Sequence, residues 1–180
     1  HSSHRRQRQM CIRDRDMLKR AHELGAEDRL IFLASGGGSA VLSLPLPGLP
    51  FEEKRRLIKY LVLSGATIDE INCVRKHVSA IKGGRLAKAA YPAEIFTYVI
   101  SDVPGDDPAD VASGPTVLDT TTLDDARAVI EKFGAPDAAL INALLENPLH
   151  ETPKDLTSGA GLRVIAVSYT HLTLPTMRTV

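Results

Sequence analysis

The 180-residue chain is long enough to form one domain with its own core, and a composition of 43% hydrophobic and 24% charged residues excludes wholesale disorder. Lys and Arg total 22, as do Asp and Glu, so the formal net charge is zero and the basic excess that nucleic-acid binding requires is absent. No apolar run is long enough to span a membrane. Two cysteines are too few for a disulfide scaffold, so a reduced, cytoplasmic setting is expected.

The two ends of the chain differ from its middle. Residues 1–20 carry seven Arg or Lys against two Asp, and residues 168–180 show neither helical nor alternating periodicity. A basic arm for nucleic acid or membranes is one interpretation of residues 1–20, but the aromatic or amphipathic pattern of such arms is missing. Both ends resemble translated sequencing-adapter read-through. We therefore expect a non-native or disordered tail over 1–20, a partial domain over 21–167 and a non-native tail over 168–180.

Strand and helix signals alternate between these ends. Short apolar runs predict strands over 29–34, 95–100 and 163–167. Helical spacing, capping residues and glycine stops predict helices over 51–64, 68–82, 85–90, 123–133 and 137–146. Apolar strands that alternate with helices predict an α/β fold, with a mostly parallel sheet covered by helices on both faces.

The first polar cluster is the glycine-rich segment that follows the first predicted strand. It consists of Ser35, Gly36, Gly37, Gly38 and Ser39. Residues without Cβ let the backbone approach an anion and turn several N–H groups toward it, so we expect a phosphate or carboxylate cradle. The lysine of a P-loop and the third glycine of the dinucleotide-binding pattern are both missing. A strand-to-helix turn without a ligand is the alternative.

The second cluster is a polar stripe on the helix expected after Thr67. Asn72, Arg75, Ser79 and Lys82 share one side of this helix, beside its apolar face. Such a stripe can reach a ligand over the edge of a sheet. The alternative is a solvated helix side with ordinary charges.

The third and fourth clusters follow the second predicted strand. Asp102, Asp106 and Asp107 place three carboxylates within six residues, which suits a hard cation such as Mg²⁺. In open α/β sheets, ligands bind at this carboxyl end of the strands. An acidic turn whose side chains cap backbone N–H groups is the alternative. The fourth cluster is a compact turn formed by Ser113, Gly114, Pro115 and Thr116.

Four motifs follow one another in the chain: SGGGSA from residue 35, SGATIDEINCVRKHVSAIKGGRLA from 64, SDVPGDDPADVASGPTVLD from 101, and ETPK from 151. In this order they resemble the N-terminal domain of the glycerate kinase family that phosphorylates the 2-position. Some members of that family are labelled hydroxypyruvate reductases. The resemblance spans residues 27–167. It implies a three-layer α/β/α Rossmann-like domain and a second domain that closes the active-site cleft.

The resemblance also implies site residues. It suggests that residues 35–39 bind phosphate or substrate and that Asn72, Arg75 and Lys82 face the cleft. Asp102 and Asp106 would lie near metal or substrate, with Asp102, Arg75 and Lys82 in the catalytic set. Further binding candidates are Ser79, Ser113, Gly114 and Thr116. Arg75 is the expected partner of the glycerate carboxylate, because a guanidinium can bind it through two parallel hydrogen bonds.

The activity implied is ATP- and Mg²⁺-dependent phosphorylation of D-glycerate to 2-phosphoglycerate. Family members also carry an upstream glycine-rich segment with a catalytic lysine and a downstream C-terminal domain, and this sequence matches neither. We therefore expect the 180-residue chain to be an inactive fragment of the enzyme. The alternatives are an NAD(P)H-dependent hydroxypyruvate reductase, whose complete GxGxxG pattern is missing, and a non-catalytic anion-binding fragment.

Overall fold

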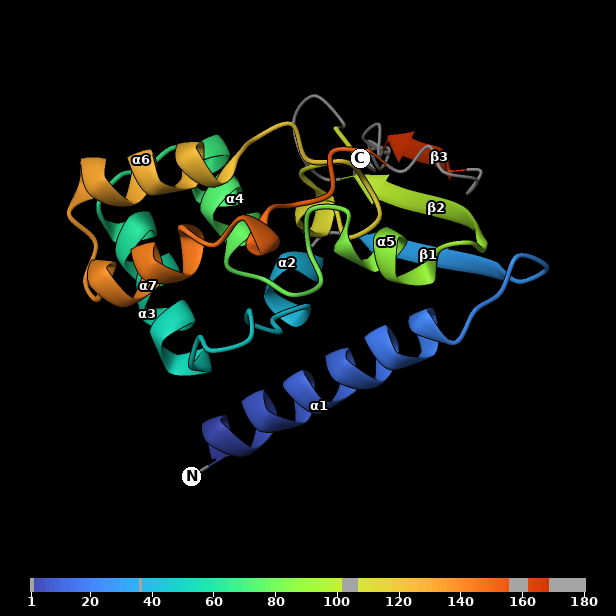
Figure 1. The fold of residues 1–180 in the computed structure, drawn as a ribbon, viewed down its shortest axis with the longest axis horizontal. Coiled ribbons are helices and arrows are strands. Elements are labelled where there is room, and N and C mark those ends of the chain that lie inside the picture. The colour runs from blue at the N-terminus through green and yellow to red at the C-terminus, as the bar shows by residue number, and fades with distance from the viewer. Residues whose placement is uncertain (1, 36, 102–106, 156–161, 169–180) are drawn as a thin grey trace, which may run out of the picture.

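A three-stranded parallel sheet organises one side of the molecule (Figure 1). The computed structural model describes residues 2–35, 37–101, 107–155 and 162–168, and side chains over 9–35, 37–100 and 107–155. The strands are β1 (Arg29–Ser35), β2 (Glu94–Ser101) and β3 (Leu162–Ser168), in the order β1-β2-β3. Arg29 pairs with Glu94 at one end of the β1–β2 register and Ser35 with Ile100 at the other. The α/β class and the parallel sheet are therefore confirmed.

The helices account for most of the remaining described chain. They are α1 (Ser2–His22), α2 (Gly38–Val41), α3 (Phe51–Leu63), α4 (Ile68–His77), α5 (Arg85–Ala90), α6 (Leu123–Phe133) and α7 (Ala138–Leu145), with 3₁₀ turns η1 (Val111–Ser113) and η2 (Pro148–His150). Complete capping boxes start α4 at Thr67 and α6 at Thr122, where each threonine hydroxyl accepts a backbone N–H. The predicted positions of α3, α5, α6 and α7 are confirmed.

The predicted helix over 68–82 ends five residues early. α4 stops at His77, and residues 78–80 pair with the segment 44–46 instead. Leu46 N donates to Val78 O at 3.2 Å and Ala80 N donates to Leu44 O at 3.1 Å. These bonds satisfy backbone groups that a longer helix would have satisfied internally. Asn72 and Arg75 thus remain on a helix, whereas Ser79 and Lys82 lie in the connection that follows it.

Two main cores stabilise the fold. α3, α4, α6 and α7 pack together at one side (Figure 1), around buried side chains that include Leu57, Leu61, Val74 and Ile130. The second core lies between α5, α1 and one face of the sheet, and includes Ile81, Leu86 and Ile95.

The opposite face of the sheet is apolar and exposed among the described residues. Ile31 is 62% exposed, Leu33 74% and Ile100 49%. Strands of parallel sheets are ordinarily covered on both faces. The three-layer arrangement therefore stays a prediction, because the described helices cover one face only.

Residues 2–22, most of which we expected to be a tail, form α1 along the second core. Cys11, Asp14 and Ala21 are buried, and Leu18 is partly buried on the same side, a helical spacing that the basic composition obscured. Asp14 Oδ2 accepts hydrogen bonds from the backbone N–H groups of residues 43 and 44, at 2.8 and 3.0 Å. The non-native origin of this segment stays a prediction. No helix in the described ranges is both long and apolar enough to cross a membrane.

Candidate functional site

A cationic cavity of about 490 Å³ lies beside the glycine-rich segment, between α2, α3 and α4. Five basic side chains line it, namely Lys54, Arg55, Lys59, Arg75 and Lys82. Among the described residues, no Asp or Glu lines this cavity. Positive charge concentrated in a concave site favours an anionic ligand.

The glycine-rich segment forms one wall of the cavity. Ser35 ends β1 and is exposed, and Gly36 lies outside the described residues. Gly37 has φ +80°, a left-handed conformation that glycine adopts without strain, and it precedes the short helix α2. Gly37 and Ser39 both line the cavity. The predicted position of this segment, at the carboxyl end of a strand, is confirmed. The prediction that this strand is buried is wrong for the described structure, because the described helices cover one face of the sheet only and Ala34 is the one buried residue of β1.

Lys82 is almost fully buried at the base of this wall. Its Nζ donates to Ser39 O at 3.0 Å and to Ala112 O at 3.1 Å, and lies 3.4 Å from Ser113 Oγ. Burial, with smaller contributions from Lys54 and Arg75, lowers the pKa of Lys82 to about 6. Lys82 thus joins the glycine-rich segment to the turn that contains Ser113.

Lys54 is a second buried amine, and the sequence interpretation missed it. Its Nζ donates to Ser43 O and Leu44 O, both at 3.2 Å. Burial lowers the pKa of Lys54 to about 7. A signal for it exists in the sequence, because Lys54 shares the apolar face of α3 with Leu57 and Leu61, where a lysine is unexpected.

Asn72 and Arg75 remain together on α4. Arg75 Nη1 donates to Asn72 Oδ1 at 3.2 Å, and Asn72 Nδ2 donates to Asp110 Oδ1 at 3.1 Å. Arg75 lines the cavity, and burial lowers its pKa. Asn72 therefore orients the guanidinium. Asp110, which we did not single out from the sequence, orients Asn72 in turn.

Three candidates lie away from the cavity and form hydrogen bonds within the buried interior. Ser79 Oγ donates to Leu44 O at 3.0 Å, and Thr116 Oγ1 lies 2.8 Å from Thr97 Oγ1 on β2. Gly114 O accepts from Gly84 N at 2.8 Å. All three residues are buried, and none is among the cavity-lining residues of the described chain. Their binding role stays a prediction without support from this geometry.

The candidate metal ligands Asp102 and Asp106 lie outside the described residues. Within the described ranges, no group of three or more His, Cys, Asp or Glu side chains could hold a metal ion. Asp107, the third carboxylate of that cluster, is exposed, and its Oδ1 accepts from Ala109 N at 2.8 Å. Asp107 therefore caps a turn, as the alternative interpretation predicted for one of the three.

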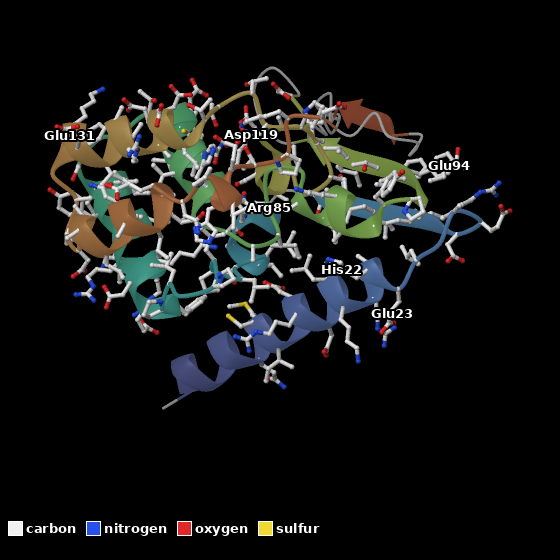
Figure 2. All side chains as sticks on the ribbon, viewed as in Figure 1. His22, Glu23, Arg85, Glu94, Asp119 and Glu131 are labelled. Carbon is white, nitrogen blue, oxygen red and sulfur yellow. The ribbon has the colours of Figure 1, made fainter. Side chains whose placement is uncertain are left out.

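The ETPK motif anchors α4 from the side opposite the cavity. His77 Nε2 lies 3.0 Å from Glu151 Oε1, and Lys76 Nζ lies 3.4 Å from Asp119 Oδ1. Burial raises the pKa of Glu151, but its hydrogen bonds, including those from Leu123 N and His77, outweigh burial and lower the pKa to about 2. Figure 2 shows Asp119 and Arg85 between the helical group and the sheet. This polar network fixes the helix that carries Arg75.

Gly38 allows the glycine-rich segment to approach the turn at Ser113. A Cβ on Gly38 would lie 2.8 Å from Ala112 Cβ, closer than two carbon atoms can pack. We expect Gly38→Ala to lower the free energy of unfolding by about 1–3 kcal/mol, measured by urea denaturation. Gly25→Ala is the control, because the nearest atom to its Cβ would be 3.7 Å away and its φ is also not positive. Equal stability of the two variants would contradict the close approach.

Comparisons with known proteins agree with the resemblance in the sequence. A protein from Agrobacterium vitis that is named as a hydroxypyruvate reductase is 49% identical over 143 residues, covering 79% of this chain and 32% of the relative. A D-glycerate 2-kinase from Thermotoga maritima is 43% identical over 144 residues, covering 80% of this chain and 34% of the relative. The chain therefore spans about a third of the length of these relatives.

A solved structure and a family match extend this result. The crystal structure of glycerate kinase from Thermotoga maritima matches with a TM-score of 0.79 and 39% identity, covering 87% of this chain and 36% of that one. Residues 11–146 match the family described as domain of unknown function DUF4147. Because this match covers well over half of the sequence, the chain belongs to the DUF4147 family, the N-terminal domain type of glycerate kinases.

Proposed function

We propose that this domain is part of an ATP-dependent kinase that phosphorylates D-glycerate to 2-phosphoglycerate. The observation that carries the proposal is the cavity, which gathers five basic side chains beside a glycine-rich segment. Phosphoryl transfer depends mainly on positioning and on neutralising negative charge. Arg55, Lys59 and Arg75 can supply the positive charge, and the glycine-rich segment can position the phosphates. The relatives named glycerate kinase support the same reaction class.

Each part of the cavity has a role in this proposal. Arg75, oriented by Asn72, binds the glycerate carboxylate. The backbone of Gly37 and Ser39, which line the cavity, approaches the phosphoryl group, and Arg55 and Lys59 on α3 add positive charge. Asp102 and Asp106 would hold Mg²⁺, since carboxylate oxygens are the ligands that this ion prefers. When bound, the ion would neutralise charge on the phosphates.

Binding to the 180-residue chain tests the anion site by itself. We expect calorimetry to detect D-glycerate binding, and Arg75→Met to weaken it by about tenfold or more, the scale of a lost charge-assisted hydrogen bond. Arg127→Met is the matched control, because Arg127 is paired with Asp124 on α6, away from the cavity. Equal affinity of both variants would remove Arg75 from the site.

A chimera tests the reaction. Residues 27–167 would replace the matching segment of the Thermotoga D-glycerate 2-kinase, which is 43% identical over 144 residues. We expect ADP formation that requires both ATP and D-glycerate. Oxidation of NADH by hydroxypyruvate without ATP would instead favour the reductase named among the relatives. If the chimera binds D-glycerate but catalyses neither reaction, the result favours a non-catalytic anion-binding domain.

A further inference from the structure

A series of three hydrogen-bonded polar groups leads from the cavity into the interior. Ser39 Oγ lies 3.0 Å from Ser113 Oγ, and Ser113 Oγ lies 3.4 Å from Lys82 Nζ. Ser39 lines the cavity, whereas Ser113 is fully buried and Lys82 is 1% exposed. Ser39, at one end of this series, can therefore meet a ligand, and Lys82, at the other end, is shielded from water.

The acceptors around Lys82 set the direction of these bonds. Its Nζ donates to the carbonyl oxygens of Ser39 and Ala112, which can only accept. In the neutral amine both N–H bonds are then used, and the lone pair is left for the Ser113 hydroxyl. Ser113 in turn can accept from the Ser39 hydroxyl. The geometry therefore provides a proton path from Ser39 through Ser113 to Lys82.

The charges around Lys82 favour the neutral amine. Lys54 on α3 and Arg75 on α4 disfavour a further positive charge, and Asp14 on α1 favours it. Burial is the largest effect, and the pKa of Lys82 is lowered to about 6. A lysine that is unprotonated at neutral pH can act as a general base.

The backbone that presents Ser113 is strained. Ala112 has φ 55° and Ser113 has φ 59°, in the left-handed region that residues other than glycine rarely adopt. Such strain persists where the surrounding structure enforces it, and it concentrates at functional sites. Here it accompanies a turn that places the Ser113 hydroxyl between Ser39 and Lys82.

We propose that Ser39, Ser113 and Lys82 form a proton relay that deprotonates the hydroxyl of a small hydroxy acid while its oxygen is phosphorylated. This inference rests on the proposed kinase function. The substrate oxygen forms the new P–O bond, and the P–O bond to the nucleoside diphosphate breaks. The substrate proton passes to Ser39 Oγ, the Ser39 proton to Ser113 Oγ, and the Ser113 proton to the lone pair of Lys82. Lys82 becomes an ammonium, and return of its proton through Ser113 and Ser39 to water in the emptied cavity resets the relay.

Covalent labelling of the 180-residue chain tests the relay without requiring turnover. A relay that removes the Ser39 proton makes this hydroxyl a nucleophile, so we expect a fluorophosphonate probe to modify Ser39, as located by mass spectrometry. Ser43 is the internal control, since it lines the same cavity and its hydroxyl donates to Val41 O instead. Labelling of Ser39 that is no faster than labelling of Ser43 overturns the relay.

Two variants remove the proton acceptor or interrupt the path. Lys82→Arg replaces the neutral amine by a cation that cannot accept a proton, and Ser113→Ala interrupts the path. We expect each to reduce Ser39 labelling by about a hundredfold, the lower end of general-base effects, and to abolish its rise with pH. Thr97→Val removes a buried hydroxyl outside the relay, so its labelling rate should stay unchanged. Labelling retained in Lys82→Arg would overturn the role of Lys82 as base.

Kinetics of the chimera connect the relay to the reaction. We expect Ser113→Ala and Lys82→Arg to lower kcat with little change in the KM for D-glycerate, and to remove the acidic limb of the pH profile. Unchanged kcat in both variants would overturn the relay while the kinase function stands. Relay-dependent Ser39 labelling in a chimera that does not phosphorylate glycerate would overturn the kinase function and the hydroxy-acid substrate, but not the proton path.

Discussion

Asp102→Asn in the chimera is expected to lower glycerate phosphorylation by about a hundredfold or more, the scale seen when a preorganised electrostatic group is lost. Asp102 follows directly after β2 (Glu94–Ser101), the central strand of the described sheet. In sequence, this position ties it more closely to a rigid strand than Asp106, which comes after Pro104 and Gly105. Asparagine keeps the approximate shape of the side chain and removes the charge that would hold Mg²⁺ or a substrate hydroxyl.

The control for this experiment is Asp107→Asn. Asp107 is exposed, and its Oδ1 accepts a hydrogen bond from Ala109 N at 2.8 Å. Removing its negative charge should therefore change the rate of glycerate phosphorylation by less than about threefold. Initial rates and thermal unfolding would be measured for the wild type and both variants. Near-wild-type turnover in Asp102→Asn would contradict the prediction. An equal loss in both variants, explained by unfolding, would make Asp102 a structural turn residue.

Lys82 is expected to make the stability of the chain depend on pH. Its pKa is lowered to about 6 in the folded state, from an ordinary value of 10.5. Between these values the unfolded chain binds a proton that the folded chain does not, so stability is lost as pH falls from 10.5 toward 6 and is gained as pH rises. One such group changes the free energy of unfolding by about 1.4 kcal/mol per pH unit. Lys54 adds to this slope above pH 7, because its pKa is lowered to about 7.

Urea denaturation between pH 6 and pH 9 measures this effect. We expect Lys82→Met to reduce the slope of stability against pH by up to about 1.4 kcal/mol per unit, because the variant has no amine to protonate on unfolding. Lys88→Met on α5 is the control, since Lys88 is exposed, and its slope should match the wild type. A wild-type slope in Lys82→Met would show that Lys82 is protonated in the folded chain, and would also remove it as the base of the relay.

Local signals predicted most of the helices and strands. The capping threonines, the glycine stops and the apolar runs act within a few residues, so α3, α5, α6, α7 and the three strands were predictable. The end of α4 was not, because residues 78–80 bond to residues 44–46, which the sequence places far away. α1 was missed for another reason, since its charged composition obscured the spacing of its buried side chains.

The candidate site was likewise predictable from the sequence only in part. By itself the sequence determined the order of the elements and the motifs, and it placed the glycine-rich segment at the end of a strand, because helical and strand periods and the conformational needs of glycine are local properties. Only the tertiary structure decided that Lys54 and Lys82 are buried amines and that Ser39 meets Ser113, 74 positions along the chain. Burial and hydrogen bonding between distant segments depend on how the elements pack, and that packing is what lowers the pKa of each amine and aligns the proton path.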